Sequence, residues 1–271
     1  MFSTNVVSLA LLAVTALVNA APLVSPVNST ALNGTGLNST TWQPGYILKP
    51  HEVILFGEDR MEVMHVDAYK ALLAEHNIFH VDTQSLEPLV SANLTIGEFE
   101  DDEALEKRGA CLYRTNTVTD TTQHFVGWDV QMSPVVRANG PRTTITVTQG
   151  YTITNAITVG ISGDWTIVKD ALKAAFKVDY QRSWSSSYSA AIAAEITPGY
   201  AGTMVSKPWT TRRYGRVLKG CVGAQKVSSN FMADSFDQGQ HAGISWVAGT
   251  IELCQKKEAR LTRCTGAGYF A

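Results

Sequence analysis

The sequence lacks cysteine before residue 111, N-glycosylation sequons after residue 95, and any long apolar run after its first 20 residues. Because a bilayer-spanning helix needs about 20 apolar residues, no later segment is expected to cross a membrane as a helix. The chain also has no G-x-S-x-G elbow, H-E-x-x-H helix, P-loop or dinucleotide fingerprint. These absences exclude the enzyme classes that such motifs mark.

The amino terminus has the features of a secretory signal. An apolar stretch covers residues 6–18, and Val18, Asn19 and Ala20 at its end are acceptable to a signal peptidase. The stretch is too short for a membrane span. We therefore predict a signal peptide over residues 1–20, cleavage after Ala20 and an extracellular protein.

Sequons and cysteines divide the chain into two parts. All four sequons precede residue 100, and all four cysteines follow residue 110. An even cysteine count in a secreted chain predicts two disulfides, with three possible pairings. No C-x-x-C pair or histidine cluster supports zinc, so we expect no metal and no cofactor. The sequon asparagines are Asn28, Asn33, Asn38 and Asn93, and the cysteines are Cys111, Cys221, Cys254 and Cys264.

An acidic run over residues 98–108 ends in the dibasic pair Lys107 and Arg108. Such a run is expected to be exposed, and a dibasic pair in an exposed linker of a secretory protein is a kexin-type cleavage site. Residues 21–108 hold five Lys/Arg against 14 Asp/Glu, net −9, whereas residues 109–271 hold 17 against 10, net +7. Opposite charges favour association, so the first partner of the mature module is expected to be its own pro-segment.

The pro-segment is expected to have two regions. Residues 21–50 are rich in Ser, Thr, Asn, Gly and Pro and predict a disordered, glycosylated stalk. Residues 51–108 are acidic and contain a small α+β piece, with a strand at 51–57 and a helix at 66–75.

The mature part, residues 109–271, is predicted to be mainly β. Apolar residues alternate with small or polar ones over residues 144–162 and 176–196, which predicts two unusually long strands. Asp164 is placed to cap a helix over 165–175 between them. Shorter strands are expected at 214–221, 243–249 and 250–256. The expected fold is an elongated antiparallel β module or a β-sandwich with one short helix.

The segment 207–221 is the strongest candidate for binding, because it combines five cations with two aromatic residues. Guanidinium groups and aromatic faces suit acidic glycans or membrane headgroups, whereas nucleic acid is not expected for a secreted protein. The alternative is a solvated edge strand. The candidate residues are Trp209, Arg212, Arg213, Tyr214, Arg216 and Lys219.

Two further functions stay open. A secreted hydrolase could use a pair of carboxylates, although only His124 and His241 are available as histidine bases after Arg108 and we expect no enzyme activity. A β-pore-forming toxin could insert the two alternating segments, since transmembrane strands need about 9–11 residues with one apolar face. That function would require a homo-oligomer. The carboxylates are Asp129, Asp164, Asp179, Glu195, Asp234 and Asp237.

The segments 52–63, 128–136, 207–216 and 231–235 resemble a family of fungal secreted effector-like proteins, over residues 51–271. The resemblance implies a secreted precursor that acts on a host or competing organism, and it brings no catalytic residues. The paired Ser/Thr-rich segments and the turn at 196–202 are also similar to aerolysin-type β-pore-forming toxins. The expected helix at 165–175 departs from a simple insertion hairpin. The leading hypothesis is a non-enzymatic, toxin-like module that binds a host or competitor surface after cleavage at Arg108.

Overall fold

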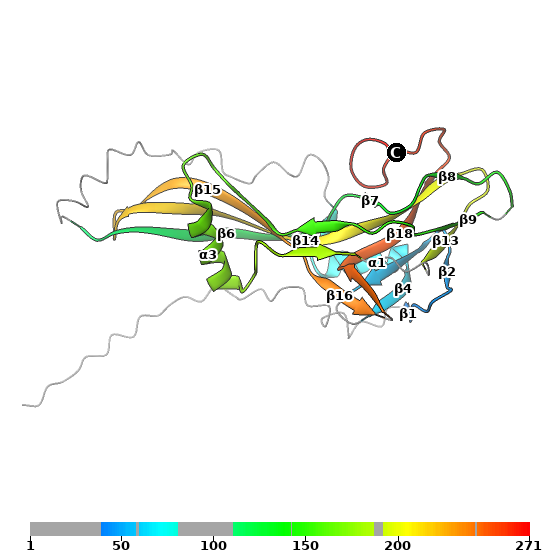
Figure 1. Cartoon of the computed structure of the whole chain (residues 1–271), viewed down its shortest axis with the longest axis horizontal. Coiled ribbons are helices and arrows are strands. Elements are labelled where there is room, and N and C mark those ends of the chain that lie inside the picture. The colour runs from blue at the N-terminus through cyan, green and yellow to red at the C-terminus, as the bar shows by residue number, and fades with distance from the viewer. Residues whose placement is uncertain (1–38, 58–59, 81–110, 142, 187–191, 242) are drawn as a thin grey trace, which may run out of the picture.

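The computed structural model describes residues 39–57, 60–80, 111–141, 143–186, 192–241 and 243–271 (Figure 1). The molecule is elongated, with a thick body at one end and a slender arm at the other. In the arm, β6, β14 and β15 run side by side, and α3 lies beside them. The prediction of a mainly β fold is confirmed, with α1 and α3 as helices in the described residues.

The elements have the following bounds: β1 (Ser39–Thr41), β2 (Ile47–Leu48), β3 (Glu52–Phe56), β4 (Met61–His65), α1 (Val66–Glu75), β5 (Phe79–His80), β6 (Tyr113–Val126), β7 (Val130–Gln131), β8 (Val136–Arg137), β9 (Thr143–Thr146), β10 (Thr152–Thr154), β11 (Ala156–Val159), α3 (Trp165–Phe176), β12 (Ser183–Ser185), β13 (Ala193–Ile196), β14 (Ala201–Cys221), β15 (Lys226–Ser235), β16 (Gln238–His241), β17 (Ile244–Val247) and β18 (Gly249–Lys256).

The 21-residue strand β14 connects the body to the arm. Its first part, up to Pro208, pairs with β18 on one edge and with β7 and β8 on the other. Its second part, from Trp209, pairs with β6 and β15. Pro208 lies at the change of partners, where a residue without an amide hydrogen is tolerated because the ladder is interrupted. One continuous strand thus joins the two ends of the molecule.

The prediction of two long strands at 144–162 and 176–196 is wrong. The first segment is divided among β9, β10 and β11, and the described residues of the second contain only β12 and β13. The longest strand is β14, which does not alternate because residues 201–208 are buried on both faces. Strands buried on both sides lack the period of two by which a half-exposed strand is recognised.

Other predicted elements are confirmed. The helix expected at 165–175 is α3, and Asp164 Oδ1 accepts hydrogen bonds from the amides of Thr166 and Ile167 as an N-cap. The helix expected at 66–75 is α1, and the strand expected at 51–57 is β3. The short strands expected near the carboxyl terminus are the end of β14, β17 and β18.

The amino-terminal segment requires a correction. Residues 21–50 were expected to be an unstructured stalk, but the described part, residues 39–50, contains β1 and β2 and the fully buried Trp42. A large aromatic side chain gains much from burial, and composition alone does not reveal that the core has room for it. The sequon residues Asn28, Asn33, Asn38 and Asn93, and the processing residues Ala20, Lys107 and Arg108, lie outside the described residues.

Both predicted disulfides are present, and the structure selects one of the three pairings. Cys111–Cys221 joins the chain just before β6 to the end of β14, at the tip of the arm. Cys254–Cys264 fastens the carboxyl-terminal loop to β18 in the body. Disulfide pairs of this kind are typical of proteins that mature in an oxidising compartment.

Gly215 is a position of close packing within the arm, between β6 and β15. A Cβ atom there would overlap the Val118 backbone oxygen and the Phe231 ring. We expect Gly215→Ala to lower the free energy of unfolding by about 1–3 kcal/mol, as overpacking does. Gly140→Ala, where the added atom meets nothing within 4 Å, should change it by less than about 0.5 kcal/mol. Urea unfolding of both variants checks this; equal effects would contradict the packing around Gly215.

Candidate functional site

The predicted cationic segment lies in the middle of the sheet and not at an edge, because β6 and β15 flank this part of β14. Arg212 forms a bidentate ion pair with Asp234, at 2.6 Å for both Nε–Oδ1 and Nη2–Oδ2. Its guanidinium also lies 5.0 Å from the Phe125 ring centroid. Hydrogen bonding to Asp234 raises the pKa of Arg212 above its usual value. The charge of Arg212 is thus neutralised within the chain.

Arg213 is buried, with 7% of its surface exposed. Its Nη1 donates to the Tyr180 hydroxyl at 3.2 Å and to Ser235 Oγ at 3.0 Å. The guanidinium carbon lies 4.4 Å from the ring centroid of Phe176, at the end of α3. Arg213 therefore fastens α3 and the turn after it to the sheet.

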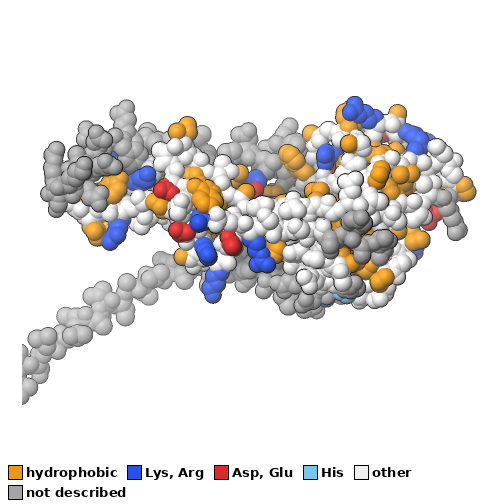
Figure 2. All heavy atoms as spheres, in the orientation of Figure 1, with side chains coloured by type: hydrophobic (Ala, Val, Ile, Leu, Met, Phe, Trp, Pro, Cys, Tyr) orange, Lys and Arg blue, Asp and Glu red, His pale blue; other side chains and the backbone are white. Residues whose placement is uncertain are grey.

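The remaining predicted binding residues also contact other parts of the chain. Arg216 pairs with Asp120 at 2.6 Å, and Lys219 Nζ donates to the Ser162 carbonyl at 3.4 Å. Trp209 Nε1 donates to the Tyr69 hydroxyl at 3.1 Å, and Tyr214 is buried. On the face shown in Figure 2, basic and acidic side chains are interspersed around α3. The six residues thus stabilise this fold, and a role for them in binding stays a prediction.

Lys207 belongs to a buried charge cluster in the body. Its Nζ lies 2.5 Å from Glu252 Oε1 and 3.7 Å from Asp129 Oδ1. Asp129 Oδ2 accepts hydrogen bonds from the amides of Cys264 and Thr265. Burial raises the pKa of Asp129, while Lys207 and these amides act in the opposite direction. The cluster holds the carboxyl-terminal loop against β14 and β18.

At least four of the six carboxylates considered for a hydrolase have hydrogen-bond or ion-pair partners in the fold. Asp129 is part of the Lys207 cluster, Asp164 caps α3, and Asp234 pairs with Arg212. Asp179 Oδ1 accepts from the Gln181 amide in a turn, and Glu195 lies opposite Thr144 in the pairing of β13 with β9. A carboxylate-pair hydrolase stays a prediction that none of these contacts favours.

His124 lies on β6, where its Nδ1 is 3.1 Å from Thr211 Oγ1. Burial lowers its pKa, and the charge of Arg213 adds to the effect. The unfolded chain therefore binds a proton at His124 more readily than the folded chain does. As the pH falls below the ordinary histidine pKa of about 6.5, this difference reduces stability.

We therefore expect the wild-type protein to lose more stability between pH 7.5 and pH 5.5 than His124→Gln does. Glutamine keeps a hydrogen-bonding group near Thr211 but does not titrate. Urea unfolding at the two pH values measures the difference. If both proteins lose the same free energy, His124 does not titrate differently in the folded and unfolded states.

Residues 143–155 and 182–196, of which 187–191 lie outside the described part of the chain, pair antiparallel at two places in registers that differ by two residues, and together with the residues between them they are called the hairpin 143–196. In the pairing of β9 with β13, Ile145 lies opposite Ala194, and in the pairing of β10 with β12, Ile153 lies opposite Trp184. One backbone hydrogen bond continues each ladder, from the Val147 amide to the Ile192 carbonyl at 2.9 Å and from the Ser186 amide to the Tyr151 carbonyl at 2.8 Å, whereas the amides of Thr148 and Gln149 donate to the Met132 carbonyl. The register moves by only two residues from one ladder to the other. The two segments predicted as separate long strands are thus the two sides of a single hairpin, and "first arm" and "returning arm" below refer to these two sides of the hairpin.

The hairpin has an apolar face and a hydroxyl face. Residues of the apolar face enter the core of the body near its base, among them Ile145, Val147 and Ile192. The opposite face carries exposed cross-strand hydroxyl pairs, Thr152 with Ser185 at 3.2 Å and Thr154 with Ser183 at 2.9 Å. This division follows the alternation in the sequence.

The tip of the hairpin is docked on the arm. β11 pairs with β15, and α3 packs on the sheet through Val168 and Leu172, against Val217, Phe231 and Ala233. Ser162 Oγ also donates to the Ser228 carbonyl at 2.6 Å. The docking buries apolar side chains that a free hairpin would expose to water.

Asn155 secures the tip, and it was not among the residues predicted to have a role. Its Oδ1 accepts from Trp184 Nε1 at 3.2 Å and from the Phe236 amide at 2.9 Å, and its Nδ2 donates to the Asp179 carbonyl at 2.8 Å. The side chain is buried. A signal was available, because Asn155 is a polar residue at an apolar position of the alternating pattern, and such residues are usually hydrogen-bonded.

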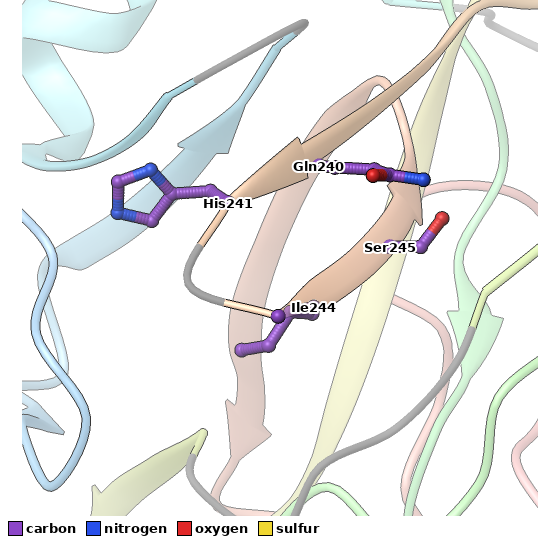
Figure 3. A pocket seen from close by; sticks show the side chains of 5 residues that line it. Gln240, His241, Ile244 and Ser245 are labelled. Atoms are coloured by element: carbon purple, nitrogen blue, oxygen red, sulfur yellow. The ribbon is translucent and has the colours of Figure 1, made fainter.

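Two hollows lie near these elements. One, of about 240 Å³, is lined by the Arg212–Asp234 pair and by apolar residues of which Trp128 is 49% exposed. The other, of about 250 Å³, lies on the hairpin of β16 and β17 (Figure 3). There Gln240 and Ser245 are cross-strand neighbours on one side, whereas His241 points away from them. The apolar lining of the first hollow comprises Phe125, Gly127, Trp128, Ile153, Pro208 and Phe236.

Within the described part of the chain, no helix combines the length and the apolar character required to span a membrane. The only described group of three potential metal ligands comprises Asp129, Cys254 and Cys264, and both cysteines are joined in a disulfide. A scan against family models and searches of curated proteins and of solved structures gave no match.

Proposed function

We propose that this protein is a secreted, toxin-like pore-former, and that the part of the hairpin 143–196 beyond β9 and β13 enters the membrane of a host or competitor cell. The observation that carries this proposal is the pairing of the two arms in registers that differ by only two residues, with apolar residues on one face and hydroxyl residues on the other. Strands that cross a membrane alternate in this way, with apolar side chains toward lipid and polar side chains toward water.

The dimensions of the hairpin support the proposal. The part of the first arm beyond the base of the hairpin, residues 148–159 up to the end of β11, exceeds the roughly 9–11 residues that a transmembrane strand needs. One hairpin leaves the backbone groups of its outer edges unpaired, which is costly in lipid. Hairpins from several copies, paired edge to edge, satisfy these groups, so the membrane form is a homo-oligomer.

The proposed activation has two steps. In the first step, cleavage after Arg108 converts the precursor into the active protein. In the second step, the tip of the hairpin separates from the arm: β11 leaves β15, and α3 leaves the sheet residues on which it packs. The net charge of +7 on residues 109–271 favours contact with anionic lipid at the start of this process. This contact with lipid does not require the six predicted binding residues, between Trp209 and Lys219, to leave their partners in the fold.

Dye release from lipid vesicles tests the proposal. The cleaved protein should release a small dye from anionic vesicles while retaining a large dextran, and the uncut precursor should release neither. Zwitterionic vesicles serve as the comparison, and release from them should be slower. Equal release of dye and dextran would indicate bilayer disruption, and no release of either would reject the membrane function.

A surface-binding function is the second candidate, favoured by the exposed Trp128 beside the hollow that Arg212 and Asp234 line. An exposed aromatic ring next to paired polar groups suits stacking with a sugar ring of a glycan. Trp128→Ala should then weaken attachment to target cells and leave dye release from glycan-free vesicles unchanged. Equal attachment by the variant and the wild-type protein would remove this candidate.

A further inference from the structure

The amino-terminal segment 39–80 is built into the same sheet as the mature part. β3 pairs with β18 over four residue pairs, from Val53 opposite Glu252 to Phe56 opposite Gly249. β4 and β1 extend the sheet beyond β3. Without this segment, β18 would present a row of unpaired backbone groups on that edge. The segment thus completes the sheet of the body.

The segment also contributes side chains to the main core. Of the 18 buried residues in the core of the body, six come from residues before His80 and 12 from residues after Cys111. Trp42, Leu48, Ile54, Phe56 and Met61 are among the six and are fully buried. Loss of the segment would expose their partners on β14, β17 and β18, such as Met204, Trp246 and Ile251, to water.

Further contacts join the segment to both the arm and the hairpin. β5 pairs in parallel with β6 at the root of the arm, where Phe79 and Phe125 lie 5.9 Å apart. Tyr69 of α1 accepts a hydrogen bond from Trp209 of β14. β2 pairs in parallel with β13, which is the returning arm of the hairpin 143–196.

We propose that residues 39–80 stay bound to residues 111–271 after the chain is cut between them, so that the processed protein consists of two noncovalently associated chains. The proposal rests on the cleavage that the proposed function includes. The cut removes a covalent link but no strand pairing and no core contact among the described residues. The pro-segment acts as a lasting structural subunit and is not released as an inhibitor.

The retained chain would have a defined place in the proposed mechanism. Through β2 it holds β13 at the base of the hairpin, while the tip is held by β15. Cutting the linker therefore does not free the base. The charges are compatible with retention, since residues 39–80 carry a net charge of −3 against +7 for residues 111–271.

The test uses the full chain with a site-specific protease sequence placed in the linker 81–110. After complete cutting, verified on a denaturing gel, native size-exclusion chromatography with mass spectrometry should find both fragments in one equimolar complex. In urea the two fragments should separate. A folded carboxyl-terminal fragment that elutes without its amino-terminal partner would overturn the proposal, whether or not the sample releases dye from vesicles.

Two variants show that retention depends on the observed interface. Ile54→Ala creates a cavity where β3 meets β18, and the cut protein should lose its amino-terminal fragment on dilution more readily than the wild-type protein does. Lys70→Ala, on the exposed side of α1, should leave retention unchanged. If both variants behave like the wild-type protein, β3 and β18 do not hold the complex. Dye release by the same samples reports separately on the pore-forming function.

Discussion

A disulfide between β11 and β15 should abolish vesicle leakage by the cleaved protein. Thr158 and Met232 are opposite each other in this antiparallel pair, and neither belongs to an apolar core cluster. Opposite residues in antiparallel strands lie about 4.5–5.5 Å apart, within the range that a disulfide bridges. Because the proposed insertion requires the tip to leave β15, the variant T158C/M232C should release no dye when oxidised.

Mild reduction should restore the activity of the locked variant. The described part of the chain has no free cysteine, so the two introduced cysteines have no other free thiol there with which to form a disulfide. The single variant T158C controls for the substitution, and wild-type protein in the same reductant controls for effects on the two native disulfides. Full leakage by the oxidised double variant would show that β11 stays on β15 while the membrane is permeabilised.

A charge on the apolar face of the hairpin should have a far larger effect on leakage than the same charge on the hydroxyl face. Ile153 and Thr154 are neighbours on opposite faces, and each has a cross-strand partner in β12. Ile153 lies at the middle of residues 148–159, the part of the first arm proposed to insert, so it is expected near the middle of the bilayer. A Lys facing lipid there costs about 2–4 kcal/mol.

This cost predicts that Ile153→Lys lowers dye release by at least about 30-fold, since each 1.4 kcal/mol is a factor of ten. Thr154→Lys adds the same charge toward water and should stay within a few-fold of the wild-type protein. Circular dichroism and urea unfolding must show that both variants fold, because Ile153 also lines the hollow beside Arg212. If both variants lose the same amount of dye release, the apolar face of the hairpin does not face lipid while the hydroxyl face faces water.

The cations of the segment 207–221 show that a basic, aromatic sequence does not by itself predict a binding surface. A segment with five cations and two aromatic residues predicted a recognition surface, yet Arg212, Arg213 and Arg216 all have partners inside the fold. Asp120, Tyr180 and Asp234 lie between 20 and 100 residues away from them in the chain. Only the folded strand order brings such partners together.

The sequence alone determined the local structure of the chain. The alternation in residues 144–196 predicted the two faces of the hairpin. Asp164 predicted the start of α3, and the even cysteine count predicted two disulfides. These features depend on neighbouring residues, whose spacing directly reflects a strand, a helix or a cap. For that reason they could be read before any fold was known.

The tertiary structure decided which segments belong together. It paired the two alternating segments as arms of one hairpin, made the non-alternating β14 the longest strand, and built the acidic segment 39–80 into the sheet beside β18. Strand pairing joins residues far apart in the chain, and a strand buried on both faces has no period to reveal it. The pattern of side chains indicates which face of a strand is buried. Only the packing of the whole chain determines which other segment covers that face.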